Sequence, residues 1–262
     1  MAEATYIHGT EQEEQERLAR LNRLTNAPFL AWLELRPTDR VLEVGSGLGL
    51  LAREVAARTP QGEVIGIEYA DAQLARAPRD VPSLRFLQGD AHHLPFAEAQ
   101  FDVVYCRYVL EHVADPALVL REMRRVLKPG GRVYALENDI VVTRWDPDCP
   151  RFDALWRQFV ALQAQLGGDG LIGKKLFRLF RQADFREITL SLQPEVHCAG
   201  QEGFVAWVEN ILGNVAGAAA KLVEHGLTTE AEIAAACDEL RSLLACEDAT
   251  ALFYWNRATG VK

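Results

Sequence analysis

Short apolar runs alternate with amphipathic stretches along the first half of the chain. Runs of mainly apolar residues, bounded by polar or turn residues, predict strands at residues 40–44, 63–67, 84–87, 101–106 and 132–136. Apolar spacings of three and four predict helices between them, at residues 50–58, 70–77 and 116–127. This alternation indicates a parallel sheet covered by helices on both faces, so ligands should bind beyond the carboxyl ends of the strands.

The second half of the chain has longer helical patterns. They predict helices at residues 151–166, 174–183, 201–224 and 230–245, and strands at residues 186–192 and 249–261 that complete the sheet. Near the first residue, Thr10 and Glu13 form a capping box that predicts a helix over residues 11–25. The expected fold class is therefore α/β, with a seven-stranded, mostly parallel sheet, helices on both faces and helical lid insertions.

The pattern predicts a single domain over residues 1–262. We expect a helical lid in 1–37, a ligand-binding core in 38–141, helical insertions on the substrate side in 142–170 and 198–247, and the end of the sheet in 171–197 and 248–262. Insertions that follow strand ends lie over the ligand-binding edge of such a sheet. No internal repeat or long Gly/Ser linker separates the two halves.

Composition narrows the class of partner. The 28 basic and 37 acidic residues give a net charge of -9, and no basic stripe follows the chain, so we expect no nucleic-acid partner. The sequence has no signal-peptide pattern and no apolar run of about 18 residues, which predicts a soluble, cytoplasmic protein without a membrane partner. A monomer and a homodimer both remain open.

The five cysteines are odd in number and widely scattered, without a C-x-x-C pair. They are expected to be reduced and mostly buried thiols. A soft-metal or metalloid site built from Cys149 and Cys198 is the alternative, but no metal is assigned.

The segment VLEVGSGLG, residues 41–49, joins a predicted strand to a helix through a glycine-rich turn. A dinucleotide-binding turn has the spacing G-x-G-x-x-G, whereas here Leu50 stands at the position of the third glycine. Glu43 precedes the turn by two residues, where a carboxylate would repel a pyrophosphate and attract an ammonium or sulfonium group. The turn therefore favours a cationic ligand.

Two further acids follow the next two predicted strands. Glu68 is placed to accept hydrogen bonds from both hydroxyls of a ribose, and Asp90 is placed to accept one from the exocyclic amine of adenine. S-adenosylmethionine combines a ribose, an adenine and a cationic amino acid without a phosphate. The three acids therefore indicate this cofactor, with S-adenosylhomocysteine as its product.

Five segments carry a resemblance to a known family: VLEVGSGLG, GIEYA, GDAHHLPF, FDVVYCRYVLEHVADP and LKPGGRVYALEND. In this order they resemble the successive motifs of the class I S-adenosylmethionine-dependent methyltransferases, most closely the ubiquinone/menaquinone-type and small-molecule group. The resemblance covers residues 38–138, and YIHGTEQEEQERL resembles the lid segment of some members. It implies a Rossmann-like fold and a methyltransferase that acts on a small-molecule substrate.

The resemblance also implies which positions contact the cofactor. These are Glu43, Gly45, Ser46, Gly47, Gly49, Glu68, Tyr69, Asp90, Ala91, Cys106 and Tyr108. The family more often has cysteine or threonine where Ser46 stands and aspartate where Glu43 and Glu68 stand, and these substitutions keep the chemistry.

No catalytic residue can be fixed from the sequence, since methyl transfer mainly requires the reactants to be held in line. Asp139 follows the fifth predicted strand, where substrates arrive, but it could be a solvated acid. His112 could be a general base, or it could cap the loop before residue 115. His8, with Tyr6, could close over the cofactor or belong to a frayed terminus.

For three other residues, the sequence allows either a substrate-binding role or a structural role. Arg107 could bind an acidic substrate or form a structural contact at a helix end. His197 and Trp145, in or near the insertions, could touch the substrate or belong to the core.

Other functions stay open beside methyl transfer to a small molecule. An enzyme of the same fold could bind S-adenosylmethionine and catalyse a cyclisation or decarboxylation without transferring the methyl group. A nicotinamide-dependent oxidoreductase is disfavoured by Glu43 and by the missing third glycine. A non-catalytic binding protein would have the cofactor motifs but a blocked substrate pocket.

Overall fold

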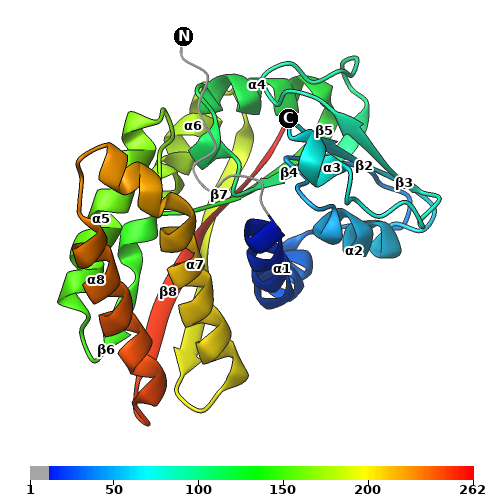
Figure 1. Cartoon of the computed structure of the whole chain (residues 1–262). Coiled ribbons are helices and arrows are strands. Elements are labelled where there is room, and N and C mark those ends of the chain that lie inside the picture. The colour runs from blue at the N-terminus through cyan, green and yellow to red at the C-terminus, as the bar shows by residue number, and fades with distance from the viewer. Residues whose placement is uncertain (1–11) are drawn as a thin grey trace.

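The computed structural model of the protein describes residues 12–262 (Figure 1). Its core is one eight-stranded sheet in the order β3-β2-β1-β4-β5-β8-β6, with β7 paired to the other edge of β8. Strands β1 to β5 are parallel, and β8 is antiparallel to β5, β6 and β7. The strands are β1 (Arg40–Val44), β2 (Glu63–Glu68), β3 (Leu84–Gln88), β4 (Phe101–Arg107), β5 (Leu127–Glu137), β6 (Arg144–Asp146), β7 (Arg186–Cys198) and β8 (Thr250–Val261).

The predicted α/β class is confirmed, but the prediction of seven strands was wrong. The additional strand is β6, whose three residues pair with the first three residues of β8. A three-residue segment is too short to show the alternation of apolar and polar positions that identifies a strand. Trp145, the central residue of β6, is buried in the core, so tertiary packing rather than local pattern holds β6 in place.

Helices cover both faces of the sheet. Buried side chains of α1, α2, α5, α7 and α8 form one apolar cluster, and those of α4 and α6 form a second. The central strands read as continuous apolar runs because both faces are covered: Val41, Leu42 and Val44 are all fully buried. The helices are α1 (Gln12–Trp32), α2 (Leu50–Arg58), α3 (Asp71–Leu74), α4 (Pro116–Val126), α5 (Pro150–Gln165), α6 (Leu176–Gln182), α7 (Glu202–Glu224) and α8 (Glu230–Ser242).

Helix α1 is longer than the predicted helix, which ended at residue 25. It continues through Pro28 to Trp32, although a proline cannot donate the backbone hydrogen bond of a helix interior. The last turn is held by packing, since Phe29 is fully buried and Leu30 nearly so. Tertiary burial therefore overrides the local break that the proline signals.

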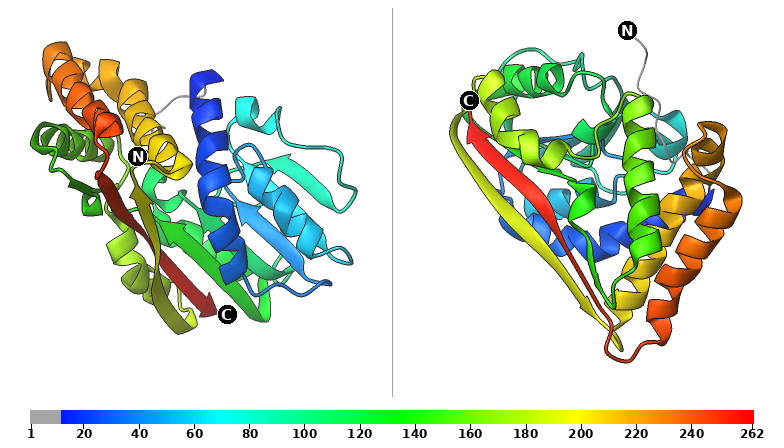
Figure 2. Two further views of the ribbon diagram at one scale, coloured as in Figure 1. Left: turned by 90° about the horizontal axis from the view of Figure 1, so that it is seen from below. Right: turned by 90° about the vertical axis from the view of Figure 1, so that its left-hand side faces the viewer.

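Strands β7 and β8 form a long antiparallel ribbon. Their pairing runs from Cys198 opposite Thr250 to Arg186 opposite Val261. Only the second half of β8, from Asn256 onward, also pairs with β5, so the first half of the ribbon extends beyond the parallel strands. There α7 and α8 lie alongside it (Figures 1 and 2).

The long helices fall in the segments that were assigned to insertions. Helix α5 lies within 142–170, and α7 and α8 lie within 198–247. The division of the chain into lid, core and insertions stays a prediction. None of the helices that the structure describes is both long and apolar enough to cross a membrane.

Candidate active site

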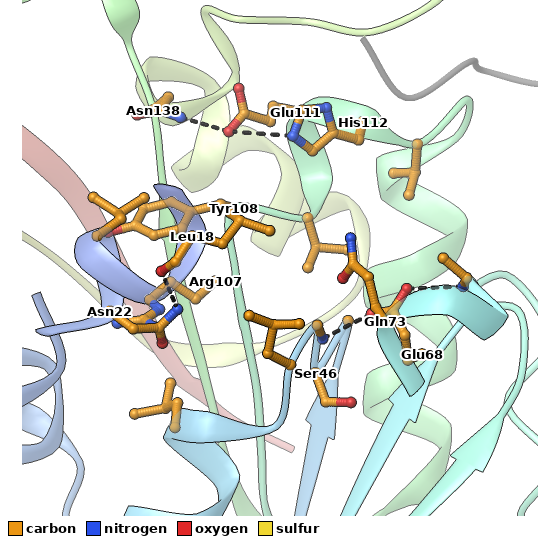
Figure 3. Close-up of a pocket in the computed structure, with 18 of the residues that line it drawn as sticks. Leu18, Asn22, Ser46, Glu68, Gln73, Arg107, Tyr108, Glu111, His112 and Asn138 are labelled. Carbon is orange, nitrogen blue, oxygen red and sulfur yellow. Dashed lines mark hydrogen bonds and ion pairs between the residues drawn. The ribbon is translucent and has the colours of Figure 1, made fainter. Parts of the chain in front are cut away.

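A cavity of about 390 Å³ opens at the carboxyl ends of β1, β2 and β4 (Figure 3). Its floor is the glycine turn between β1 and α2, and its other walls come from α1, α5, α7 and β8. It therefore lies at the edge where the sequence placed the ligand. The cavity brings together most of the predicted cofactor residues, namely Glu43, Gly45, Ser46, Gly47, Glu68, Tyr69, Asp90, Ala91 and Tyr108.

The turn after β1 needs glycine for two different reasons. Gly45 has a φ of +72°, and a Cβ there would stand 2.4 Å from Val109 Cγ2. Gly49 has a φ of +69°, and a Cβ there would stand 2.4 Å from Phe86 Cζ. Gly49 does not line the cavity. Its expected role as a cofactor contact is corrected to one of close packing between the start of α2 and strand β3.

At the glycine turn, the cavity wall has two polar groups that lack a hydrogen-bond partner among the residues that the structure describes. Glu43 is 3% exposed, and its Oε2 accepts no hydrogen bond from them; the same holds for the buried Oγ of Ser46. Burial raises the pKa of Glu43 to about 8, although the positive charge of Arg107 opposes the shift. A cationic ligand in the cavity would supply the missing partner and favour the ionised carboxylate.

Glu68 connects the ends of two loops. Its Oε2 accepts a hydrogen bond from the backbone N–H of Gly47 at 2.8 Å, and its Oε1 accepts one from Ala70 N–H at 2.9 Å (Figure 3). Each carboxylate oxygen has further lone pairs, so both can accept from a diol as well. Tyr69 follows and is 63% exposed at the cavity mouth.

Asp90 is engaged by the residue two positions further along. Its Oδ1 lies 2.9 Å from the backbone nitrogen of His92 and 2.7 Å from the Nδ1 of the same residue. Burial tends to raise the pKa of Asp90, but the contacts with His92 outweigh it and keep the pKa below its ordinary value. Asp90 is therefore a fixed, ionised acceptor at the cavity wall.

Residues at the end of β4 point in different directions. Cys106 is fully buried on the face opposite the cavity, with its Sγ 3.9 Å from Glu137 Oε1, so its predicted contact with the cofactor is corrected. The alternation of side chains along a strand accounts for this placement. Tyr108 has a φ of 58° and lines the cavity, because the chain leaves the strand there in a left-handed conformation.

Arg107 anchors α1 over the cavity. Its guanidinium donates hydrogen bonds to Thr25 Oγ1 at 3.2 Å, Asn22 Oδ1 at 2.6 Å and Asn26 Oδ1 at 2.8 Å. The guanidinium also lies over the ring of Phe29 at 5.5 Å. The sequence allowed either a contact with an acidic substrate or a structural contact, and the structure shows a structural contact between Arg107 and α1.

The three candidate catalytic residues differ in where they lie relative to the cavity. Asp139 is 8% exposed and does not line the cavity. His112 does line it, and its Nε2 lies 3.7 Å from Glu111 Oε1. Glu111 is held by the side-chain amides of Asn138 and Gln163. His8, like Tyr6, lies outside the described residues.

An aromatic wall that no sequence motif predicts forms the side of the cavity away from the glycine turn. Trp207 and Phe253 stand 5.4 Å apart, Phe253 and Trp255 4.6 Å, and Trp255 and Tyr108 4.6 Å, measured between ring centroids. Trp156 and Phe159 of α5 also line the cavity. These rings come from distant segments and match the spacing of ordinary core residues, so no local signal marked them.

His197 and Trp145 belong to the core. His197 is 8% exposed and stacks on Trp207 at 5.2 Å, and Trp145 is 6% exposed. Neither lines the cavity. The described residues also contain no group of three or more side chains that could hold a metal ion.

Comparison with known proteins identifies a methyltransferase-domain match in the first half of the chain. A family model for a methyltransferase domain matches residues 42–135. A demethylmenaquinone methyltransferase of Deinococcus radiodurans is 41% identical over 102 residues, which are 37% of this chain and 42% of that protein.

Residues 42–135 of this chain therefore match the methyltransferase-domain family.

Two further comparisons extend beyond the motif region of this chain. An uncharacterized 37.1 kDa protein from a Streptomyces fradiae transposon is 36% identical over 163 residues, 58% of this chain and 45% of that protein. The chain therefore spans less than half the length of the two curated relatives it matches. The YcgJ protein of Bacillus subtilis shares the fold, with a TM-score of 0.58 at 20% identity over 90% of this chain and 97% of that one.

The cavity fits S-adenosylmethionine, the cofactor that the sequence motifs indicate. The unpartnered Glu43 Oε2 and Ser46 Oγ suit the ammonium and carboxylate of a methionine group. Glu68 can accept from ribose hydroxyls, and Tyr69 and Asp90 border the place where a base would follow. Among the residues described, the two arginines that line the cavity, Arg17 and Arg107, donate to side chains of α7 and α1.

Proposed function

We propose that the protein transfers the methyl group of S-adenosylmethionine to a small-molecule acceptor. The observation that carries the proposal is the placement of Glu43, Glu68 and Asp90 at the ends of successive strands around one cavity. Of these, Glu43 is buried with an unpartnered oxygen, which costs free energy unless a ligand supplies a partner. A cationic cofactor that carries a ribose accounts for all three positions.

When bound, the cofactor supplies a methyl group activated by a sulfonium charge. The task of the chain is to hold the acceptor atom in line with that methyl group, which raises the rate mainly through orientation. Glu43 and Ser46 would hold the methionine end, and Glu68 would fix the ribose. Gly45 and Gly47 let the backbone approach the ligand without a side chain in between.

The acceptor would occupy the part of the cavity between Tyr108 and the aromatic wall. The cavity volume of about 390 Å³ lies near the lower end of the range for ligand pockets, so a cofactor and a small acceptor fill it. Arg17 of α1 donates a hydrogen bond to Asn210 of α7 at 2.8 Å, which links two walls of the cavity. This link helps to exclude water from the reacting atoms.

His112 is the side chain we propose to take a proton from the acceptor when one must leave. It lines the cavity, and Glu111 beside it would favour the imidazolium that forms. Glu111 itself is fixed by two amides, so the pair is held in place. Asp139, outside the cavity lining, has no part in this proposal.

Calorimetric titration with S-adenosylmethionine, S-adenosylhomocysteine and NAD tests the cofactor assignment. We expect the first two to bind and NAD not to bind. Glu68→Ala should weaken binding about 100-fold, because hydrogen bonds to a charged group are lost, whereas Glu98→Ala, at an exposed position, should not. Tight NAD binding, or unchanged affinity in Glu68→Ala, would contradict the assignment.

Transfer of a labelled methyl group tests the reaction itself. Label that passes from the cofactor to a small molecule supports methyl transfer, whereas a product without label from a consumed acceptor supports a cyclisation or decarboxylation. Cytoplasmic location, the absence of a nucleic-acid partner and the choice between monomer and homodimer stay predictions of the sequence.

A further inference from the structure

The aromatic wall has a buried carboxyl group behind it. Glu195 on β7 is 8% exposed and lies opposite Phe253 in the ribbon. Its Oε1 accepts a hydrogen bond from Trp255 Nε1 at 2.9 Å and from Gln193 Nε2 at 3.2 Å. Burial raises the pKa of Glu195, and these two donors oppose the shift. A carboxylate that accepts from the indole N–H makes the ring face of Trp255 more electron-rich.

A second carboxyl group stands at the cavity itself. Glu111 lines the cavity and is 4% exposed, with its oxygens held by Asn138 and Gln163. The acceptor side of the cavity thus combines aromatic faces with one buried acid in its lining, Glu111. The second acid, Glu195, lies behind the rings, with its Oε2 3.6 Å from His197 Nε2. Electron-rich rings together with negative charge form an environment that stabilises a cation.

The cationic side chains of the cavity are already engaged. Arg107 donates to three side chains of α1, and Arg17 donates to Asn210. Arg107 also carries the compensating charge for Glu43. Among the residues described, no other arginine and no lysine lines the cavity. A positively charged acceptor would therefore meet aromatic faces and the carboxyl group of Glu111 rather than unengaged arginines.

We infer that the acceptor of this methyltransferase is an aliphatic amine, which binds as a cation against Trp207, Phe253 and Trp255. The inference rests on the proposed function and names its substrate class. For transfer, the ammonium loses a proton to His112. The nitrogen lone pair then forms the new N–C bond as the S–C bond of the cofactor breaks, and sulfur keeps the electron pair of that bond.

A pair of probes with the same shape and different charge tests the inference without any reaction. Choline carries a quaternary ammonium that cannot be methylated, and dimethylbutanol replaces its nitrogen with carbon. Each is titrated by calorimetry into the protein saturated with S-adenosylhomocysteine. We expect choline to bind about tenfold more tightly, in the range found for a cation on aromatic faces.

The outcomes separate this inference from the proposed function. Equal affinity for the two probes, tighter binding of dimethylbutanol, or binding of neither would overturn the amine assignment while leaving the cofactor site intact. Failure of S-adenosylhomocysteine to bind in the first place would instead count against the proposed function.

A charge-removing variant tests the role of the buried carboxyl. Glu195→Gln keeps an acceptor for the indole N–H of Trp255 and removes the charge, so choline affinity should fall about fivefold while dimethylbutanol affinity stays the same. Glu247→Gln, at an exposed position, is the matched control. Unchanged discrimination in a folded Glu195→Gln protein would remove Glu195 from the inference. If the variant does not fold, the affinities of the wild type for choline and dimethylbutanol still test whether the acceptor binds as a cation.

Discussion

The two sides of the cavity are built on different principles. The cofactor side uses backbone geometry and short polar motifs within residues 43–91, where Gly47 and Glu68 join the loops after β1 and β2. The acceptor side uses bulky rings from distant segments, such as Trp156 on α5, Trp207 on α7 and others on β8. One side is specified locally along the chain and the other only by the assembled fold.

This difference predicts whether a single substitution should impair binding of the cofactor or of the acceptor. A change in the glycine turn alters the backbone and should remove cofactor binding. A change in the aromatic wall alters side-chain packing and should affect the acceptor while the cofactor still binds. A substitution on one side that impaired binding on the other side would contradict this separation.

Gly45→Ala should have the largest effect. The new Cβ would stand 2.4 Å from Val109 Cγ2 and would force a left-handed conformation on alanine. We expect S-adenosylhomocysteine binding to be lost in calorimetry and the unfolding free energy to fall by about 2–4 kcal/mol. Gly130→Ala is the control, since Gly130 has a φ of +76° with nothing within 4 Å of the new Cβ. It should lose only about 1 kcal/mol and bind normally.

Trp255→Leu should impair methyl transfer while leaving cofactor binding intact. Removing this ring from the wall should lower the rate of methyl transfer about 100-fold, while affinity for S-adenosylhomocysteine changes by less than about threefold. Trp145→Leu removes another buried indole that does not line the cavity. Both variants should lose about 2–4 kcal/mol of stability, but only Trp255→Leu should lose activity. Equal loss of activity would show that general destabilisation is responsible.

Arg107→Met should loosen α1 from the cavity. It removes the hydrogen bonds to Asn22, Thr25 and Asn26, and we expect cofactor affinity to fall about tenfold with faster amide exchange in α1. Arg58→Met is the matched control, because Arg58 also holds α1, through the carbonyl of Leu30 at 2.9 Å. Arg58 lies away from the cavity lining, so its variant should bind the cofactor normally.

Glu43 and Glu137 are two buried carboxyl groups with similarly raised pKa values, and their variants should have smaller effects. Burial raises the pKa of each to about 8, but only Glu43 lines the cavity, while Glu137 accepts from the backbone N–H groups of Val109 and Leu110. Because the folded pKa lies above the ordinary value of 4.5, each group contributes stability below about pH 4.5 that is lost as pH rises through 8.

A cationic cofactor should ionise Glu43 on binding. Near pH 7 we expect release of up to one proton per bound S-adenosylmethionine and tighter binding as pH rises toward 8. Calorimetry in two buffers of different ionisation enthalpy measures the release. Glu43→Gln should abolish it and Glu137→Gln should retain it, whereas release that persists in Glu43→Gln would assign the proton to another group.

Much of the core and the cofactor side could be predicted from the sequence. The strands at residues 40–44 and 101–106 were readable because continuous apolar runs end at turn residues, and the acids Glu43 and Glu68 stood at strand ends in recognisable spacing. Cys106 was misplaced because a motif position does not say on which face of its strand a side chain lies. The aromatic wall was missed because Trp207 and Trp255 meet only after the ribbon and α7 have packed together.

Strand β8 has a consequence for how such proteins could diversify. One half of it is fixed by β5, while the other half carries Phe253 and Trp255 beyond the parallel strands. Inserting two residues into both ribbon strands would shift the wall by about 7 Å and keep every ring on the same face, because side chains alternate with a period of two. Inserting one would turn the rings away from the cavity. The ribbon can therefore change length in steps of two, giving new acceptor specificities without altering the residues that hold the cofactor.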